Sequence, residues 1–251
     1  MPTPFTHLET AQRLLVDETI PADIRAYLNN ERPAFLLGSI AADARINGNL
    51  NREDTHFYSY DKGISSHPWR VMVSKYPDLL VPVSPAQRAF VAGYVGHLSM
   101  DEIWSLEMLG PHFANREWGS RTFRFLMLHI LLISMDERDY ERLELWHSSA
   151  LAAAEPHGWA RFMSDTVLQE WRDYIRQQLR PNGISETLQV LGSRINKSAD
   201  ELRSILDSRE QMDHDLWVNV APEVLISVEQ SMYIHAREQL CTYWEESQES
   251  F

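Results

Sequence analysis

The sequence contains a single cysteine, Cys241, so no disulfide can form within the chain. A lone cysteine is typical of proteins from a reducing compartment, and we expect a cytoplasmic location. The first residues lack the basic start and apolar stretch of a secretory leader. The longest apolar run, residues 125–135, is interrupted by His129 and falls short of the roughly 20 residues that span a bilayer. We therefore expect no transmembrane segment.

Basic residues are also in short supply. The chain carries 23 Lys and Arg against 36 Asp and Glu, a formal net charge of -13. This balance argues against a broad basic surface, which would bind nucleic acid by releasing counterions. A small anionic ligand at a metal ion remains compatible with it, because a bound divalent cation reverses the sign of the local field.

Alternating strand patterns are scarce, and we predict an all-α fold. Helix-start signals precede apolar residues at helical spacing in three places: Thr6 with Glu9, Ser84 with Gln87, and Ser198 with Glu201. The predicted helices cover residues 6–17, 20–30, 33–41, 85–108, 120–137, 139–153, 163–179, 185–194, 198–206 and 222–246. Residues 42–84 are the least helical part and contain two short β-like stretches, 71–73 and 79–83. A loop of this length is usually functional or mobile.

The best candidate for a boundary is the turn signal at residues 181–183, Pro-Asn-Gly. It divides a metal-binding helical core, residues 1–180, from residues 181–251. We expect the second part to be an acidic, helical C-terminal extension packed on the same domain.

The sharpest local signal lies in residues 93–101, Gly-Tyr-Val-Gly-His-Leu-Ser-Met-Asp. A helix places residues four apart on one face, so His97 and Asp101 can bind a single ion. Glycine inside a helix costs about 1 kcal/mol relative to alanine, which indicates that Gly93 and Gly96 admit a neighbouring helix or ligand at close range. Taken alone, such a His–Asp pair is more often a salt bridge or a hydrogen-bonded core pair.

Three further candidate ligands strengthen the metal interpretation. Asp43 follows a run of small residues, and His56 lies in the same polar segment. His7 is predicted at the first helical position, behind a Thr6 cap, where its side chain can lean past the helix end. The order His, Asp, His and then His-x-x-x-Asp is more specific than any one of these pieces.

In this order and in the residues around it, the chain resembles the zinc-dependent phospholipase C family, with single-strand-specific nucleases as more distant relatives. The resemblance covers about the first 110 residues. It is carried by four segments: Phe5-Thr-His7, Leu37-Gly-Ser-Ile-Ala-Ala-Asp43, Thr55-His-Phe-Tyr58, and Ala92-Gly-Tyr-Val-Gly-His-Leu-Ser-Met-Asp101.

The resemblance implies a compact multi-helix bundle of that family's type, with zinc at its centre. It implies one zinc ion among Asp43, His56, His97 and Asp101, and a second zinc that Asp101 bridges and His7 also binds. In secreted members the amino-terminal residue completes the second zinc; here that ligand is left open between Met1 or Pro2, water and another side chain.

The family's third zinc site takes two further histidines and a glutamate. No His-x-x-x-Glu stands at the expected place, so the sequence favours two zinc ions over three. His112, His129 and Asp136 are the candidates for an additional metal or an outer shell. A hydrogen-bonded histidine in an apolar helix is an equally good interpretation of His129.

The implied chemistry is hydrolysis of a phosphoester by a metal-activated water. On the resemblance, Asp43 is the candidate general base. The substrate is expected to be a small phosphoester or a phospholipid head group; the oligomeric state is not indicated. The alternative is a non-enzymatic helical protein that keeps the fold and binds a metal or a protein partner.

The other histidines carry weaker signals. Glu144 and His147 form a Glu-x-x-His pair, but a di-iron bundle needs two such motifs, so we interpret this one as a partly exposed helix face. Of the remaining histidines, His67 and His157 are assigned to loops. His214 is assigned to a solvated charge cluster and His235 to the core.

Overall fold

The computed structural model describes residues 1–248, and within them every regular element is a helix. The all-α prediction is therefore confirmed; the specific phospholipase C type stays a prediction. In chain order the elements are α1 (Pro4–Leu14), α2 (Ala22–Asn30), α3 (Arg32–Ile40), η1 (Ala41–Ala44), α4 (Arg45–Gly48), α5 (Arg52–His56), α6 (Pro68–Lys75), η2 (Pro77–Leu80), α7 (Pro85–Ile103), η3 (Trp104–Ala114), α8 (Arg121–Arg142), α9 (Trp146–Ala152), α10 (Asp165–Gln178), α11 (Thr187–Arg194), α12 (Ala199–Leu206), α13 (Arg209–Gln211), η4 (Met212–Trp217) and α14 (Pro222–Glu246).

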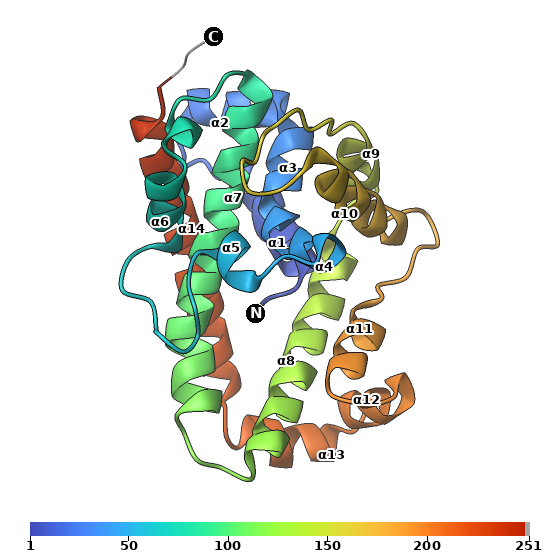
Figure 1. Cartoon of the computed structure of the whole chain (residues 1–251). Helices are drawn as coiled ribbons and strands as arrows, with labels where there is room; N and C mark the ends of the chain where they lie inside the picture. The colour runs from blue at the N-terminus through green and yellow to red at the C-terminus, as the bar shows by residue number, and fades with distance from the viewer. Residues whose placement is uncertain (249–251) are drawn as a thin grey trace.

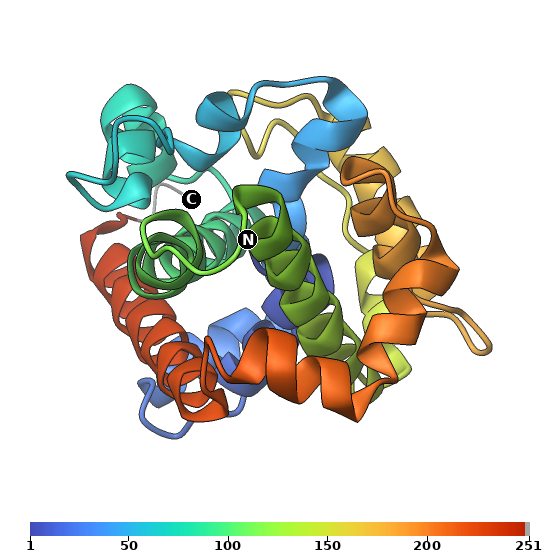
Figure 2. The same ribbon diagram turned by 90° about the horizontal axis from the view of Figure 1, so that it is seen from below.

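Helix α7 is the axis of the fold. It packs most extensively against α3 and α14, while α1 packs against α3 and α8. In Figure 1, α7 runs down the middle of the molecule, with α14 on one side and α8 on the other. Seen from below in Figure 2, the orange and red C-terminal helices lie along the outer edge, around the green α7 and α8. This arrangement buries almost the whole of α7, including its polar residues.

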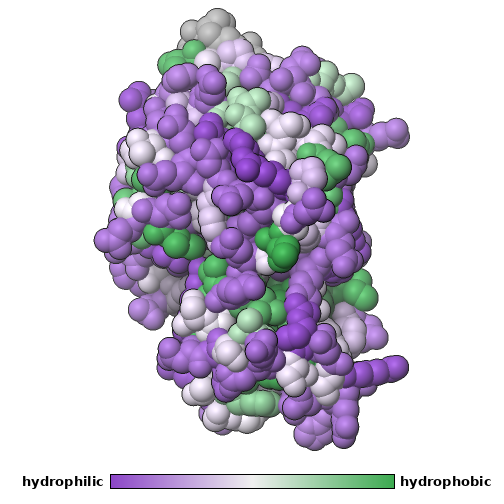
Figure 3. Space-filling model, turned by 90° about the vertical axis from the view of Figure 1, so that its right-hand side faces the viewer, coloured by the Kyte–Doolittle hydropathy of each residue, from purple (hydrophilic) through white to green (hydrophobic). Residues whose placement is uncertain are grey.

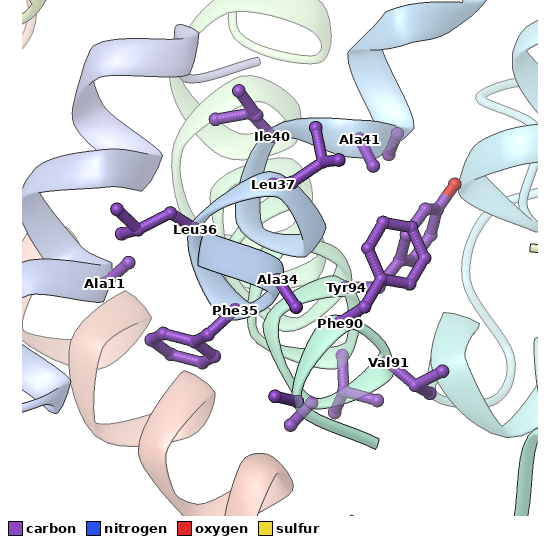
Figure 4. Close-up of a cluster of buried hydrophobic side chains, with 14 of the residues drawn as sticks. Ala11, Ala34, Phe35, Leu36, Leu37, Ile40, Ala41, Phe90, Val91 and Tyr94 are labelled. Atoms are coloured by element: carbon purple, nitrogen blue, oxygen red, sulfur yellow. The ribbon is translucent and has the colours of Figure 1, made fainter. Parts of the chain in front are cut away.

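Glycine allows α3 and α7 to cross at close range. A β-carbon at Gly38 would lie 2.0 Å from the carbonyl oxygen of Phe90, and one at Gly93 would lie 2.2 Å from that of Phe35. Buried side chains of both helices, among them Leu36 and Leu37 of α3 and Phe90 and Tyr94 of α7, surround this crossing (Figure 4). The prediction for Gly93 is confirmed. For Gly96 it is wrong as regards a neighbouring helix, since a β-carbon there would have no atom within 4 Å.

The buried hydrophobic residues form two clusters. The larger one joins α1, α3, α7, α10 and the end of α14. The second lies between α8, η3, α11, α12 and the first half of α14. Helix α14 thus contributes to both, through Leu240 and Tyr243 in the first and Val228 and Met232 in the second. The proposed division into residues 1–180 and 181–251 stays a prediction.

Several helix ends follow the sequence signals. Ser84 accepts a hydrogen bond from the Gln87 amide, and Ser198 and Glu201 form a complete capping box. The predicted Thr6 cap is wrong: α1 begins at Pro4, so Thr6 and His7 lie inside the helix. Pro is well suited to the first helical turn because its missing amide has no partner there.

Other differences concern the middle of the chain. The region 42–84 is largely helical, and the two β-like stretches lie in or next to α6 and η2. The helix predicted at 85–108 changes at Trp104 into the π-helical η3, which extends to Ala114. The helices predicted at 120–137 and 139–153 are divided later, after Arg142, and the segment 209–217 is helical although no helix was predicted there.

None of the helices within residues 1–248 has the length and apolar character that a bilayer crossing requires. The face made by the right-hand side of Figure 1 is mostly hydrophilic, with hydrophobic residues scattered in small patches (Figure 3).

Candidate metal centre

The five predicted ligands lie together where α7 meets α1, η1 and α5. Asp101 is at the centre: one carboxylate oxygen lies 3.6 Å from His7 Nε2, and the other lies 3.4 Å from both His56 Nε2 and His97 Nε2. Asp43 Oδ1 lies 3.7 Å from His56 Nε2. Their ligand atoms form two overlapping groups, each within 4.8 Å: His56, His97 and Asp101, and His7, Asp43 and His97.

These separations are those of ligands around a cation and are too long for hydrogen bonds. An N–H···O bond measures about 2.7–3.2 Å. Two atoms that each lie about 2.0–2.1 Å from one tetrahedral ion are about 3.3 Å apart. The Nε2 atoms of all three histidines and both carboxylate oxygens of Asp101 are buried without a hydrogen-bond partner. A buried carboxylate in this state is costly, and a bound cation would compensate it. The donor set therefore fits zinc.

Two of the histidine rings are held so that Nε2 faces the carboxylates. His97 Nδ1 lies 2.8 Å from the Ser39 carbonyl oxygen, which can only accept, so Nδ1 carries the proton. His56 Nδ1 lies 2.9 Å from the Thr55 hydroxyl. That hydroxyl donates to the Arg52 carbonyl oxygen at 3.3 Å and so accepts from the ring. Both rings present a free Nε2 lone pair, and such support from outside the site raises metal affinity.

Burial and mutual contact set the ionisation of the cluster. Burial lowers the pKa of His56 to about 4 and, together with His97, lowers the pKa of His7. Burial disfavours the charged form of Asp101, yet the neighbouring histidines hold its pKa well below the usual range. Burial also disfavours the charged form of His97, but Asp101 and Asp43 raise its pKa. At neutral pH His7 and His56 are neutral and Asp101 is ionised, which are the states that ligate metal, whereas His97 must release any proton on Nε2 when an ion binds.

The cluster adjoins a large cavity of about 970 Å³. Of the five residues only Asp43 lines it; its side chain is also the most exposed of the five, at 13%. Four arginines line the same cavity against two carboxylates, which makes it locally cationic in an acidic protein: Arg45, Arg52, Arg121 and Arg194 against Asp43 and Asp61. The remaining wall is mainly apolar and includes Leu106, Leu109, Phe125, Leu128, Leu132 and Leu191.

The outer candidates are not brought into this cluster. Neither His112, His129 nor Asp136 belongs to a group of three or more ligand-type residues within the described part of the chain. His129 lines the cavity, with Nδ1 2.6 Å from the Phe125 carbonyl oxygen, and His112 is half-buried at the end of η3. Asp136 is fully buried and accepts a hydrogen bond from Ser185.

The pH dependence of stability tests whether Asp136 is a metal ligand or a buried, hydrogen-bonded carboxyl group. Burial raises its pKa to about 6, although hydrogen bonds from Thr3, Ser185 and Thr187 oppose the shift. The folded chain therefore holds this proton more tightly than the unfolded chain, so stability is lost as the pH rises from about 4 to about 6, by on the order of 3 kcal/mol.

The substitution Asp136→Asn is accordingly expected to stabilise the chain by about 1–3 kcal/mol at pH 8 and to have little effect at pH 4. Thermal unfolding at the two pH values measures this difference. A carboxylate that binds a cation must be ionised, so destabilisation by Asp136→Asn in zinc-loaded protein at pH 8 would instead support an outer metal site.

The interpretation of His147 as part of an exposed helix face needs correction. His147 is fully buried, with its ring stacked on Trp146 at 3.8 Å, so only Glu144 of this pair occupies an exposed face. His67 and His235, assigned to a loop and to the core, both contact Glu102 on α7. These three residues are too far apart in the sequence for any spacing to reveal them.

Comparison of the chain with family models, with curated proteins and with solved structures gave no match. We therefore infer the function from the geometry of the site.

Proposed function

We propose that the chain is a zinc-dependent hydrolase of phosphoesters, with two zinc ions held by His7, Asp43, His56, His97 and Asp101. The observation that carries the proposal is the set of buried, unpartnered nitrogen and carboxylate atoms, separated by 3.4–3.7 Å, beside a cationic cavity. Such ions, when bound, polarise phosphoryl oxygens and lower the pKa of a water molecule.

The chain's own residues divide the remaining tasks. Asp101 holds the three histidines around one carboxylate, and its burial excludes water from them. Asp43 is the member of the cluster that reaches the cavity, so it is placed to take the proton from an attacking water. As the phosphorus–oxygen bond of the ester breaks, that proton can pass to the leaving oxygen.

Arg52 is a candidate for binding the phosphoryl group. It lines the cavity, and its guanidinium donates to the Tyr58 carbonyl and hydroxyl oxygens at 3.2 and 2.6 Å. Burial lowers the pKa of Arg52, but Tyr58, Tyr60 and Asp101 raise it by more, so the net shift is upward and the guanidinium stays charged. A fixed guanidinium matches the two oxygens of a phosphoryl group.

Arg52→Met is expected to raise KM by about 10- to 100-fold, because a charge-assisted hydrogen bond contributes about 1.5–3 kcal/mol. The zinc content should not change, since Arg52 is not a ligand. Arg209→Met is the matched control, because the Arg209 side chain is 95% exposed. An unchanged KM for Arg52→Met would remove this residue from the binding site.

The cavity supports a substrate with an anionic centre and an apolar part. Its cationic lining suits a phosphoester, and its leucine-rich wall suits a hydrophobic substituent. A small soluble phosphoester and a phospholipid head group both meet this description. The single cysteine and the acidic surface are compatible with the cytoplasm, which remains our proposal for location.

Hydrolysis assays test the proposal. Protein purified without added metal would be assayed against bis-p-nitrophenyl phosphate, p-nitrophenyl phosphocholine and short-chain phospholipids. We expect hydrolysis of at least one, abolished by a chelator, restored by zinc and absent in His97→Ala. Zinc binding without turnover on a broad phosphoester panel would instead support a non-enzymatic metal-binding protein.

A further inference from the structure

A second group of ligand-type side chains lies on another side of α7. His67 Nδ1 lies 2.9 and 3.0 Å from the two carboxylate oxygens of Glu102, and His235 Nε2 lies 3.2 Å from the second of them. The three residues come from the residue before α6, from α7 and from α14. Their ligand atoms all lie within 4.8 Å of one another.

This group is separate from the metal centre described above. Glu102 follows Asp101 directly, and one residue along a helix turns the side chain by about 100°. Asp101 therefore faces α1 and α5, whereas Glu102 faces α6 and α14. No residue belongs to both groups.

The carboxylate of Glu102 has the surroundings of a metal ligand. Its side chain is only 7% exposed, and its ion-pair partners are the two histidines. The distances of 2.9–3.2 Å are those of hydrogen bonds between the two histidines and the carboxylate. They are a few tenths of an ångström shorter than the spacing of about 3.3 Å between ligands of a tetrahedral zinc ion. A small outward movement of the His67 ring would accommodate the ion, and His67, which is 43% exposed, has room to make it.

We propose that His67, Glu102 and His235 form a second, mononuclear zinc site. Two histidines and one glutamate are a known zinc donor set that leaves a fourth position open to water or another ligand. The exposed edge of His67 gives an ion access from solvent. The strongly negative net charge of the chain favours cation binding in general.

Zinc at this site would fix the end of the segment that borders the cavity. Residues 57–67 connect α5 to α6, and His67 is the last of them. Several residues of this segment line the cavity: Tyr58, Tyr60, Gly63 and Ile64. An ion that joins His67 to α7 and α14 anchors the segment at its far end. An ion at the Glu102 group would therefore stabilise one wall of the cavity without touching the first metal centre.

The test compares two double variants of the full chain. The first, His67→Ala with His235→Ala, removes two ligands of the proposed site. The second, His157→Ala with His214→Ala, is the matched control: it removes the same number of imidazoles from exposed positions outside the site. Each protein is loaded with Zn²⁺, freed of excess by gel filtration and analysed for metal.

We expect the first variant to bind one zinc equivalent fewer than the wild type and the control to match the wild type. Equal zinc content in all three proteins would overturn the site. If the first metal centre were not to bind zinc at all, the wild type would still bind one equivalent, and the first variant would lose it. Failure of the proposed function is thus distinguishable from failure of this site.

A second readout reports on the segment itself. Lys62 is exposed within residues 57–67, and trypsin cleaves after it. Zn²⁺ is expected to slow this cleavage at least about threefold in the wild type and the control, because a segment anchored at His67 exposes its backbone to the protease less often. The slowing should be smaller in the His67→Ala, His235→Ala variant, where only His56 of the first metal centre restrains the start of the segment. An equal effect there would contradict the assignment.

Discussion

Asp101→Asn is expected to reduce bound zinc at the five-residue centre to a small fraction of the wild-type content and to lower hydrolysis by at least about 100-fold. Within residues 1–248, Asp101 is the one residue whose side chain approaches three histidines. Asparagine keeps the shape but removes the charge that balances the cations. Altering a residue that only supports a ligand already costs 10- to 100-fold in affinity or activity, so losing this central ligand should cost more.

Two measurements separate this effect from unfolding. The metal-free Asp101→Asn chain should keep the helical content of the wild type in circular dichroism. It should be less stable at neutral pH, because it lacks the carboxylate whose pKa the neighbouring histidines hold well below the usual range. Added zinc should raise the melting temperature of the wild type and have little effect on the variant. Wild-type zinc content and activity in Asp101→Asn would contradict the assignment of Asp101 as the shared ligand.

Gly93→Ala is expected to destabilise the chain by at least about 3 kcal/mol, a decrease of roughly 6–12 °C in melting temperature. The new β-carbon would lie 2.2 Å from the Phe35 carbonyl oxygen and 2.8 Å from the Ser39 amide nitrogen. Both are backbone atoms, so α3 and α7 must separate. Since the Ser39 carbonyl also orients His97, zinc affinity should fall as well.

The matched control is Gly96→Ala, three residues along the same helix. A β-carbon there has no atom within 4 Å. Alanine is favoured over glycine inside a helix by about 1 kcal/mol, so this variant should be slightly more stable than the wild type. Thermal or denaturant unfolding of the two variants measures the contrast. Equal effects would show that the close crossing of α3 and α7 does not limit stability.

The sequence predicted the helical class, most of the long helices and the identity of the five clustered residues. Helix α7 could be predicted from local signals, because its N-cap, the proline in its first turn and the spacing of its apolar residues all indicate the same helix. The convergence of His7, Asp43 and His56 on that helix was predicted from the order of the residues and from the resemblance. Their role as zinc ligands stays a prediction.

Other features depend on tertiary contacts that the sequence does not encode locally. The π-helical η3 continues α7 past residue 103, although Pro111 lies within it. Residues 42–84 look like a loop because their helices are short and are held by packing against α7 and α10 rather than by periodicity. The Glu102 group joins positions 67, 102 and 235, so only the folded chain brings it together.

The central claim is that His7, Asp43, His56, His97 and Asp101 share bound zinc. Crystals grown from zinc-loaded protein and measured on both sides of the zinc absorption edge test it most directly. We expect anomalous density among these five side chains, and its loss in crystals of Asp101→Asn. Zinc-loaded crystals with ordered side chains at this position and no anomalous density between them would contradict it.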